Sequence, residues 1–201
     1  MKHPLAPACL AWLLAVAASS AVDLTPHFVT RGTGDGAVQV PYFLEGETRY
    51  SLEIPPGVRT LGGAGEVTFF FNELDGASFT MKASPFKPDA PFTGPSLETY
   101  RQALSRYLPP GAQAPTPKSE DPDPLPGRGW AGHRFTIDYK LPGRAFVQSV
   151  TYLNFGERQQ IVLIITAPAP LFQQAEELSL RMMNSWHDLS PREDLAVPPT
   201  S

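Results

Sequence analysis

Alternating apolar and polar residues predict strands over much of the N-terminal half of the chain. Residues 48–54 alternate strictly, which predicts a strand with one buried face, and residues 38–44 predict a shorter one. Residues 66–71 and 77–83 predict a hairpin, because Asp75-Gly76 supplies the turn between them. We expect this half of the chain to form a sheet.

Three further strands follow one another closely in the C-terminal half. Residues 130–141, 144–154 and 159–166 are joined by short connections, so we expect an antiparallel meander. The run from Ile161 to Ile165 is apolar at every position. A strand without alternation is covered on both faces, and the sheet therefore needs a layer on each side.

Two amphipathic segments can supply these layers. Residues 96–108 predict a helix that begins at Ser96 and ends before Pro109, and residues 168–189 predict a longer one with apolar residues at spacings of three and four. The expected fold class is α+β: an antiparallel sheet of about six strands covered by two helices, an α/β/α sandwich.

Three segments lack such patterns. Residues 22–36 are predicted to be a flexible, irregular lead-in. Residues 109–127 contain seven prolines, the acidic residues Glu120, Asp121 and Asp123, and one large aliphatic side chain, Leu125. Such a composition predicts a mobile, exposed loop. The tail, residues 190–201, is predicted to be disordered, which leaves a single domain over residues 37–189.

The N-terminus predicts export. Residues 1–21 have a positive Lys2, a short apolar stretch and small residues at the end, which is the order found in a cleavable signal peptide. Cleavage after Ala21 removes Cys9, the only cysteine. We therefore expect a soluble periplasmic or secreted protein without disulfides, thiolate metal sites or a cysteine nucleophile.

Composition and charge narrow the classes of function. The chain has 23 prolines among 201 residues and a charged fraction of 18%, which argues against coiled coils and helical arrays. The formal net charge is −4, and no basic cluster is present that could follow a phosphate backbone. We expect no binding to nucleic acid.

Candidate catalytic residues are few. The chain beyond residue 21 has the histidines His27, His133 and His187, and it contains neither G-x-S-x-G nor H-E-x-x-H. His133 shares a predicted strand face with three apolar residues, so a packed histidine is the favoured interpretation. His187 is expected at the C-terminal end of the second helix, where a cation suits the helix dipole.

Carboxylates do not form an evident pair either. Asp138 is expected to make an exposed cross-strand ion pair, and the acidic run at 120–123 is interpreted as solvated charge. Glu66, Glu73 and Glu157 are further carboxylates without a recognisable partner. We predict no catalytic, metal-binding or cofactor-binding residues and no cofactor, and the sequence does not indicate which surface binds a partner.

The order of predicted elements resembles the PsbP-like superfamily, which includes the DcrB-like exported proteins of bacteria. The likeness extends over residues 37–189 and is carried by segments 50–57, 130–135, 159–163 and 172–186. The resemblance implies a non-catalytic exported domain that binds a protein partner in the cell envelope as an assembly or chaperone-like accessory. The alternative is an envelope hydrolase that uses His133 and a carboxylate.

Overall fold

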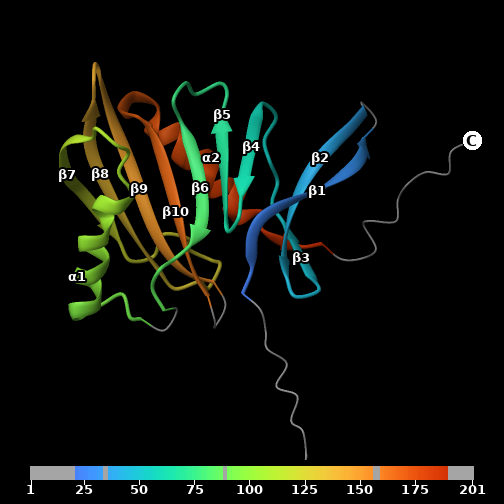
Figure 1. Ribbon diagram of the computed structural model, residues 1–201, viewed down its shortest axis with the longest axis horizontal. Coiled ribbons are helices and arrows are strands. Elements are labelled where there is room, and N and C mark those ends of the chain that lie inside the picture. Colours follow the sequence, from blue (N-terminus) through green and yellow to red (C-terminus); the bar gives the residue numbers. More distant parts are fainter. Residues whose placement is uncertain (1–20, 34–35, 88–89, 156–158, 190–201) are drawn as a thin grey trace, which may run out of the picture.

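Two antiparallel sheets lie side by side in the computed structural model, which describes residues 21–33, 36–87, 90–155 and 159–189 (Figure 1). The large sheet has the strand order β4-β5-β6-β10-β9-β8-β7, and the small sheet has the order β1-β2-β3-β11. The strands of the large sheet are β4 Val58–Gly63, β5 Glu66–Phe71, β6 Ser78–Ala83, β7 Gln113–Asp121, β8 Gly132–Leu141, β9 Arg144–Phe155 and β10 Gln159–Pro168. Those of the small sheet are β1 Asp23–Thr33, β2 Gly36–Glu45, β3 Thr48–Ser51 and β11 His187–Asp188.

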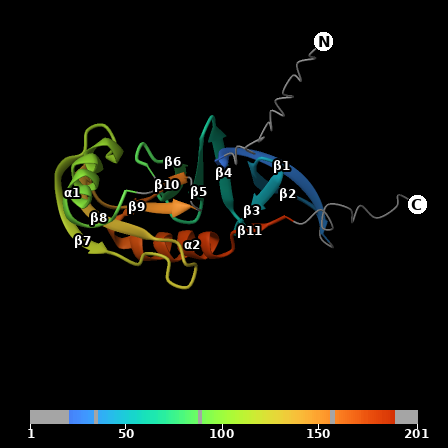
Figure 2. The ribbon, with the colours of Figure 1, turned by 90° about the horizontal axis from the view of Figure 1, so that it is seen from below.

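The helices lie on opposite faces of the large sheet (Figure 2). On one face, α1 Gly94–Ala103 continues into the 3-10 turn η1 Leu104–Tyr107, and on the other, η2 Ala169–Leu171 leads into α2 Phe172–Asn184. This α/β/α arrangement confirms the predicted fold class, with more strands than the six expected. None of the helices in the described part of the chain is long and apolar enough to cross a membrane.

Strand β10 is buried on both faces, as its uninterrupted apolar run predicts. Val162 and Ile164 belong to the core beneath α1, whereas Ile161, Leu163 and Ile165 belong to the core beneath α2. The strand lies between β6 and β9 in the sheet. Its apolar side chains therefore join two helix-covered cores through one strand.

The small sheet shares the core on the α2 side. Trp186, which follows α2, stacks on Phe43 of β2 and Tyr50 of β3 with ring centroids 5.3 and 5.6 Å apart, and it meets Phe155 of β9 edge-on at 5.1 Å. The backbone of Val22 exchanges two hydrogen bonds with the Gln159 side chain. These contacts hold the two sheets together.

The predicted hairpin and meander are confirmed. β5 and β6 pair around the turn that contains Asp75-Gly76, and β8, β9 and β10 pair in sequence order. The sequence did not predict β4. Its exposed, glycine-containing half shows no alternation, and its strand conformation follows from pairing with β5.

The predicted irregular lead-in was wrong for the described residues of 22–36. Residues 23–33 form β1, which pairs with β2 over eight residue pairs with one register shift. Val22 and Leu24 are buried in the shared core. Pairing with β2 therefore gives this segment a strand conformation that its own pattern does not signal.

The predicted mobile loop at 109–127 was also wrong, because its middle forms β7. The strand pairs with β8 at the sheet edge, with register shifts around Ala114-Pro115 and Lys118. Proline is tolerated at an edge, since half of the backbone groups there face solvent and need no ladder partner. Leu125 is only 2% exposed and packs in the α2-side core, which anchors the end of the segment.

The ends of both predicted helices differ from the structure. α1 begins after Thr93, not at Ser96, and α2 ends at Asn184, not at residue 189. His187 therefore lies on β11, where its Nδ1 is 2.7 Å from the Ser185 carbonyl oxygen, and not in the helix. The Arg128 guanidinium donates hydrogen bonds to three carbonyl oxygens at this helix end, those of Met183, Asn184 and Trp186. The predicted tail and residues 1–20 of the predicted signal peptide lie outside the described residues.

Strand β1 crosses β4 so closely that only glycine fits at the crossing. A Cβ atom on Gly62 would overlap the ring of Pro26, whereas a Cβ on the neighbouring Gly63 would meet nothing. We expect Gly62→Ala to lower the free energy of unfolding by about 1–3 kcal/mol, because the proline ring cannot rotate away.

The matched control for this substitution is Gly63→Ala, in the same strand. Chemical denaturation of both variants measures the difference. Equal stabilities would show that β1 does not pack on β4 at Gly62.

Candidate binding pocket

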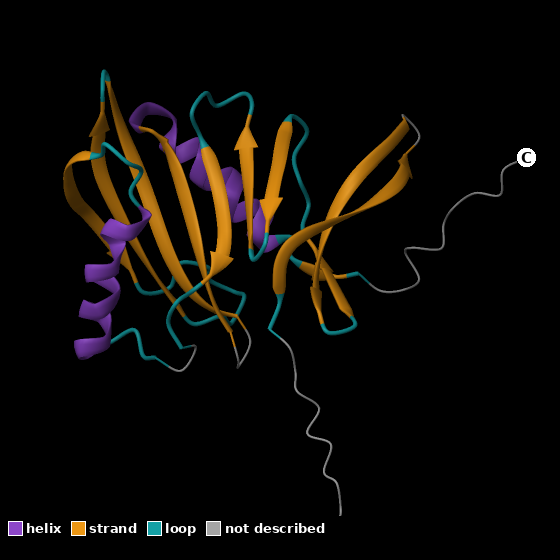
Figure 3. Ribbon diagram, in the orientation of Figure 1, coloured by secondary structure: helices purple, strands orange, loops and turns teal. Residues whose placement is uncertain are grey.

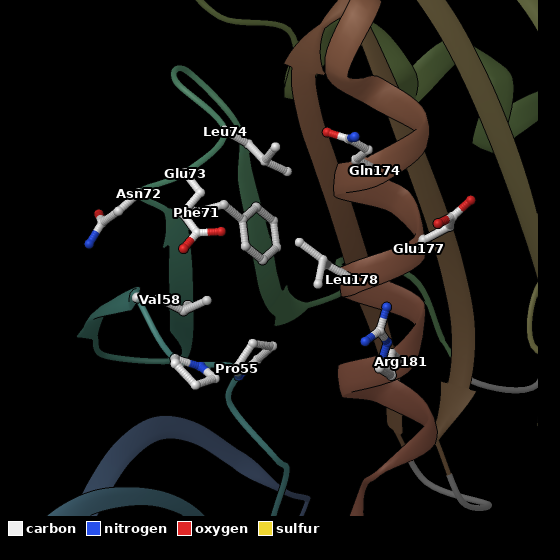
Figure 4. Close-up of a pocket in the computed structure, with 12 residues that line it drawn as sticks. Pro55, Val58, Phe71, Asn72, Glu73, Leu74, Gln174, Glu177, Leu178 and Arg181 are labelled. Carbon is white, nitrogen blue, oxygen red and sulfur yellow. The ribbon is translucent and has the colours of Figure 1, made fainter.

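A pocket with a volume of about 330 Å³ lies between α2 and the edge of the large sheet (Figure 4). One wall is α2, which contributes Gln174, Leu178 and Arg181 at helical spacing. The other wall comprises the turn before β4 together with the end of β5 and the turn after it, with the lining residues Pro55, Pro56, Gly57, Val58, Phe71, Asn72, Glu73 and Leu74.

Short-range backbone contacts shape the sheet-side wall. Val58 donates a backbone hydrogen bond to the Pro55 carbonyl at 3.3 Å, and Gly57 between them has φ +79°, a value that favours glycine. In the β5–β6 turn, the Leu74 N–H donates to Phe71 and the Ala77 N–H donates to Leu74. The two turns hold Pro55 and Leu74 beside one helix.

The pocket has an apolar floor and a charged rim. Phe71 and Leu74 are buried, while Val58 and Leu178 are half-buried. Figure 4 shows Leu74 and Leu178 pointing into the space between the walls. The rim residues Glu73, Gln174, Glu177 and Arg181 are exposed. Such a site can take an apolar group and contact charges around it.

The rim charges have no ion-pair partners among the described residues. The ion pairs on this side of the protein are made by other residues, such as Arg134 with Glu176 at 2.9 Å and Arg144 with Asp75 at 3.1 Å. Glu177 accepts a hydrogen bond from Gln173, and neither Glu73 nor Arg181 forms a described side-chain contact of this kind. Glu73 and Arg181 are therefore available to a binding partner.

A second pocket lies next to the first around the same turn. It has a volume of about 280 Å³ and shares Phe71 and Asn72 with the larger one. Phe70 and Ser78 line it from the sheet face opposite α2. In the aromatic run at 69–71, Phe69 and Phe71 are buried in the core, while Phe70 stacks with the Arg59 guanidinium 4.7 Å from its ring centroid.

The structure brings His133 and a carboxylate together, although away from both pockets. The His133 Nε2 is 3.3 Å from Glu120 Oε2, and Arg101 donates two hydrogen bonds to the same carboxylate at 2.7 and 2.8 Å. The Arg101 guanidinium, followed by the contact with His133, holds the pKa of Glu120 below its ordinary value. The group ties α1 to β7 and β8.

The environment of His133 is that of a packed residue. Its ring lies 4.7 Å from that of Phe135 and 6.4 Å from that of Phe92, and the residue is 5% exposed. Neither described pocket is lined by it. The ring is thus largely enclosed by packed side chains, and the geometry gives no support to a hydrolase built on His133 and Glu120.

The remaining candidates have structural contacts. Asp138 pairs across strands with Lys118 at 3.6 Å, and both side chains are about half exposed, as expected. The acidic run is not merely solvated, because Asp121 pairs with Arg134 at 2.6 Å while Glu120 pairs with Arg101. His27 stacks on Tyr42, and Glu157 lies outside the described residues. Among the residues that the structure describes, no group of three or more metal-ligating side chains gathers.

The sequence did not predict this pocket as a binding site. Glu73 was predicted only as a carboxylate without a partner, and residues 55–57 lie just beyond the strand predicted at 48–54. The α2 residues Gln174 and Arg181 lay on the polar side of an amphipathic pattern and carried no signal of their own. A pocket formed by two turns and a helix distant in sequence becomes visible only when these elements meet.

No protein-family model matches the chain, and no curated protein matches its sequence. Among solved structures, it is similar to cyanobacterial PsbP (CyanoP) from Synechocystis, with 12% identity and a TM-score of 0.42 over 83% of this chain and 94% of that one. It is also similar to LpqN, involved in cell envelope biogenesis of Mycobacterium tuberculosis, with 10% identity and a TM-score of 0.41 over 82% and 92% of the two chains. A third structure is PA94 from Pseudomonas aeruginosa, a protein of unknown function described as a putative regulator, with 15% identity and a TM-score of 0.39 over 83% and 98%.

A PsbP protein is thus among the structures that this chain is similar to, in agreement with the resemblance given by the sequence. At these identities and TM-scores, the likeness says nothing about what this chain binds.

Proposed function

We propose that this chain is a non-catalytic, exported accessory domain that binds a protein partner in the cell envelope through the pocket between α2 and the β5–β6 turn. The observation that carries the proposal is a concave site with an apolar floor, whose rim residues Glu73 and Arg181 are unpaired within the described chain. The predicted signal peptide supports the location, and the buried packing of His133 favours a binding role over a catalytic one.

The pocket suits part of a protein surface better than a fully enclosed small molecule. Its sheet-side wall ends in exposed residues, and its helix-side wall continues into the exposed residues of α2. A projecting apolar side chain can enter between Leu74 and Leu178 while its neighbours contact the charged rim. This division into a buried anchor and a polar surround is typical of protein interfaces.

Site-specific photo-crosslinking in the native host tests this function. A photoreactive amino acid is placed at position 174 on the pocket rim, and at the matched control position 102, an exposed glutamine of α1. We expect a light-dependent adduct with an envelope protein from position 174 and none from position 102.

A variant that fills the pocket provides the second arm of this test. Leu178→Arg in the chain labelled at position 174 should abolish the adduct, while circular dichroism checks that the variant remains folded. Identical adducts from positions 174 and 102, or no adduct from position 174, would contradict the proposed function.

A further inference from the structure

Strand β4 is an edge of the large sheet, and apart from Gly62, where Pro26 of β1 packs against it, its outward side pairs with no described strand. The Asn72 N–H donates to the Gly57 carbonyl, which fixes the phase of the β4–β5 ladder. The backbone N–H and C=O groups of successive residues point to opposite sides of an antiparallel strand. Those of Arg59 and Leu61 therefore face β5, whereas those of Thr60 face away from the sheet. Figure 1 shows β4 as the last strand on this side, with β1 and β2 diverging from it.

The opposite edge of the sheet is protected in ways that β4 is not. β7 contains Pro115 and Pro117, has two register shifts, and carries Lys118 in an ion pair with Asp138. Proline, bulges and charged residues are the means by which proteins prevent strand addition at an edge. β4 has no proline and keeps one register with β5 over all six residues.

The side chains of β4 indicate the chemistry of a strand that would pair with it. Val58 packs against the α2-side core, and side chains alternate along a strand, so Arg59 and Leu61 project from the opposite face of the sheet. No helix of the described residues covers this part of that face (Figure 3). Leu61 is 59% exposed, the largest value among the exposed large apolar side chains of the described residues. Arg59 is exposed, stacks on Phe70 and forms no ion pair with a described residue.

We infer that β4 pairs with an extended segment of the protein partner, which adds to the large sheet as a further strand. Charge complementarity places an acidic side chain opposite Arg59, and an apolar side chain two residues away lies opposite Leu61. The backbone N–H and C=O of Thr60 pair with the added strand. The inference rests on the proposed function and gives the partner a second contact, separate from the pocket.

A second copy of this chain fits the edge less well. β4 carries Arg59 and no acidic residue, so an antiparallel pair of β4 strands would offer neither arginine a carboxylate. The added strand therefore belongs to a different polypeptide, in which acidic and apolar residues occupy alternate positions.

The same crosslinking assay tests this inference when the photoreactive amino acid is placed at position 61. We expect an adduct with the partner, and mass spectrometry should locate the crosslink in a segment with alternating acidic and apolar residues. Thr60→Pro removes the outward N–H and should lower the adduct yield about fivefold, whereas Thr60→Ser should leave it unchanged. Thermal unfolding of the proline variant verifies that β4 stays folded.

Charge reversal tests the inference without altering the backbone. Arg59→Glu should also lower the yield about fivefold, and Arg59→Lys should retain most of it. An adduct that survives both Thr60→Pro and Arg59→Glu, or an adduct with a second copy of the chain, overturns the inference. An adduct from position 174 with none from position 61 overturns it while the proposed function stands. If neither position gives an adduct, both are wrong.

Discussion

Replacing Trp186 by alanine is expected to lower the free energy of unfolding by about 3–5 kcal/mol. The indole is 5% exposed and contacts the rings of Phe43, Tyr50 and Phe155, which come from both sheets. Its removal leaves a cavity where the small sheet meets the large one. Much of the lost stability therefore comes from weaker packing between the two sheets. Urea denaturation followed by circular dichroism measures it.

Trp186→Phe is the matched control, because a phenyl ring retains stacking contacts with Phe43 and Tyr50. The Trp186 Nε1 has no hydrogen-bond partner among the described residues, so the smaller ring leaves none of their acceptors unpaired. We expect this variant to lose clearly less stability than Trp186→Ala. Similar losses in both variants would mean that the site requires the full indole volume, and a loss below 1 kcal/mol in Trp186→Ala would show that the sheets are held together by other contacts.

The second large effect is expected from Leu125→Ala, with a loss of about 2–5 kcal/mol. The proline content around Leu125 predicts a mobile loop, in which this truncation would be neutral. In the structure, the side chain is buried in the core beneath α2. The change in the free energy of unfolding therefore shows whether this segment is packed or mobile.

Asp123→Ala, two residues earlier, serves as the comparison. The Asp123 side chain is exposed, and a change at such a position usually alters stability by no more than about 0.5 kcal/mol. Protease digestion provides a second readout, because loss of the Leu125 anchor should expose residues 109–127 to cleavage. Equal stability and equal protease resistance in the two variants would indicate that residues 109–127 form a mobile loop.

The sequence by itself determined the helices and the central strands. The continuous apolar run at 161–165 requires cover on both faces, and the two amphipathic segments supply it, so the α/β/α layering follows from local pattern. The hairpin at Asp75-Gly76 and the meander of β8, β9 and β10 follow from turn chemistry and short connections. These features are local, and therefore readable without knowledge of distant partners.

Strands β1, β4 and β7 were decided only by the tertiary structure. Each is weakly patterned, rich in glycine or proline, and becomes a strand because a neighbouring strand satisfies its backbone hydrogen bonds. Edge positions also tolerate residues that a central strand would reject, such as Pro115 and Pro117. At such positions, pairing with a neighbouring strand stabilises the strand conformation more than intrinsic propensity opposes it. Predictions from the sequence pattern are therefore wrong there.

The pocket likewise depends on tertiary structure. Its floor joins Val58, Leu74 and Leu178, which are far apart in the chain, and its rim charges are ordinary surface residues until α2 lies beside the β5–β6 turn. By contrast, the packed state of His133 was readable from the apolar residues on its strand face. Buried core residues recur with the period of a strand or helix, so a sequence can predict them. A binding site assembled from turns and a helix face has no such period.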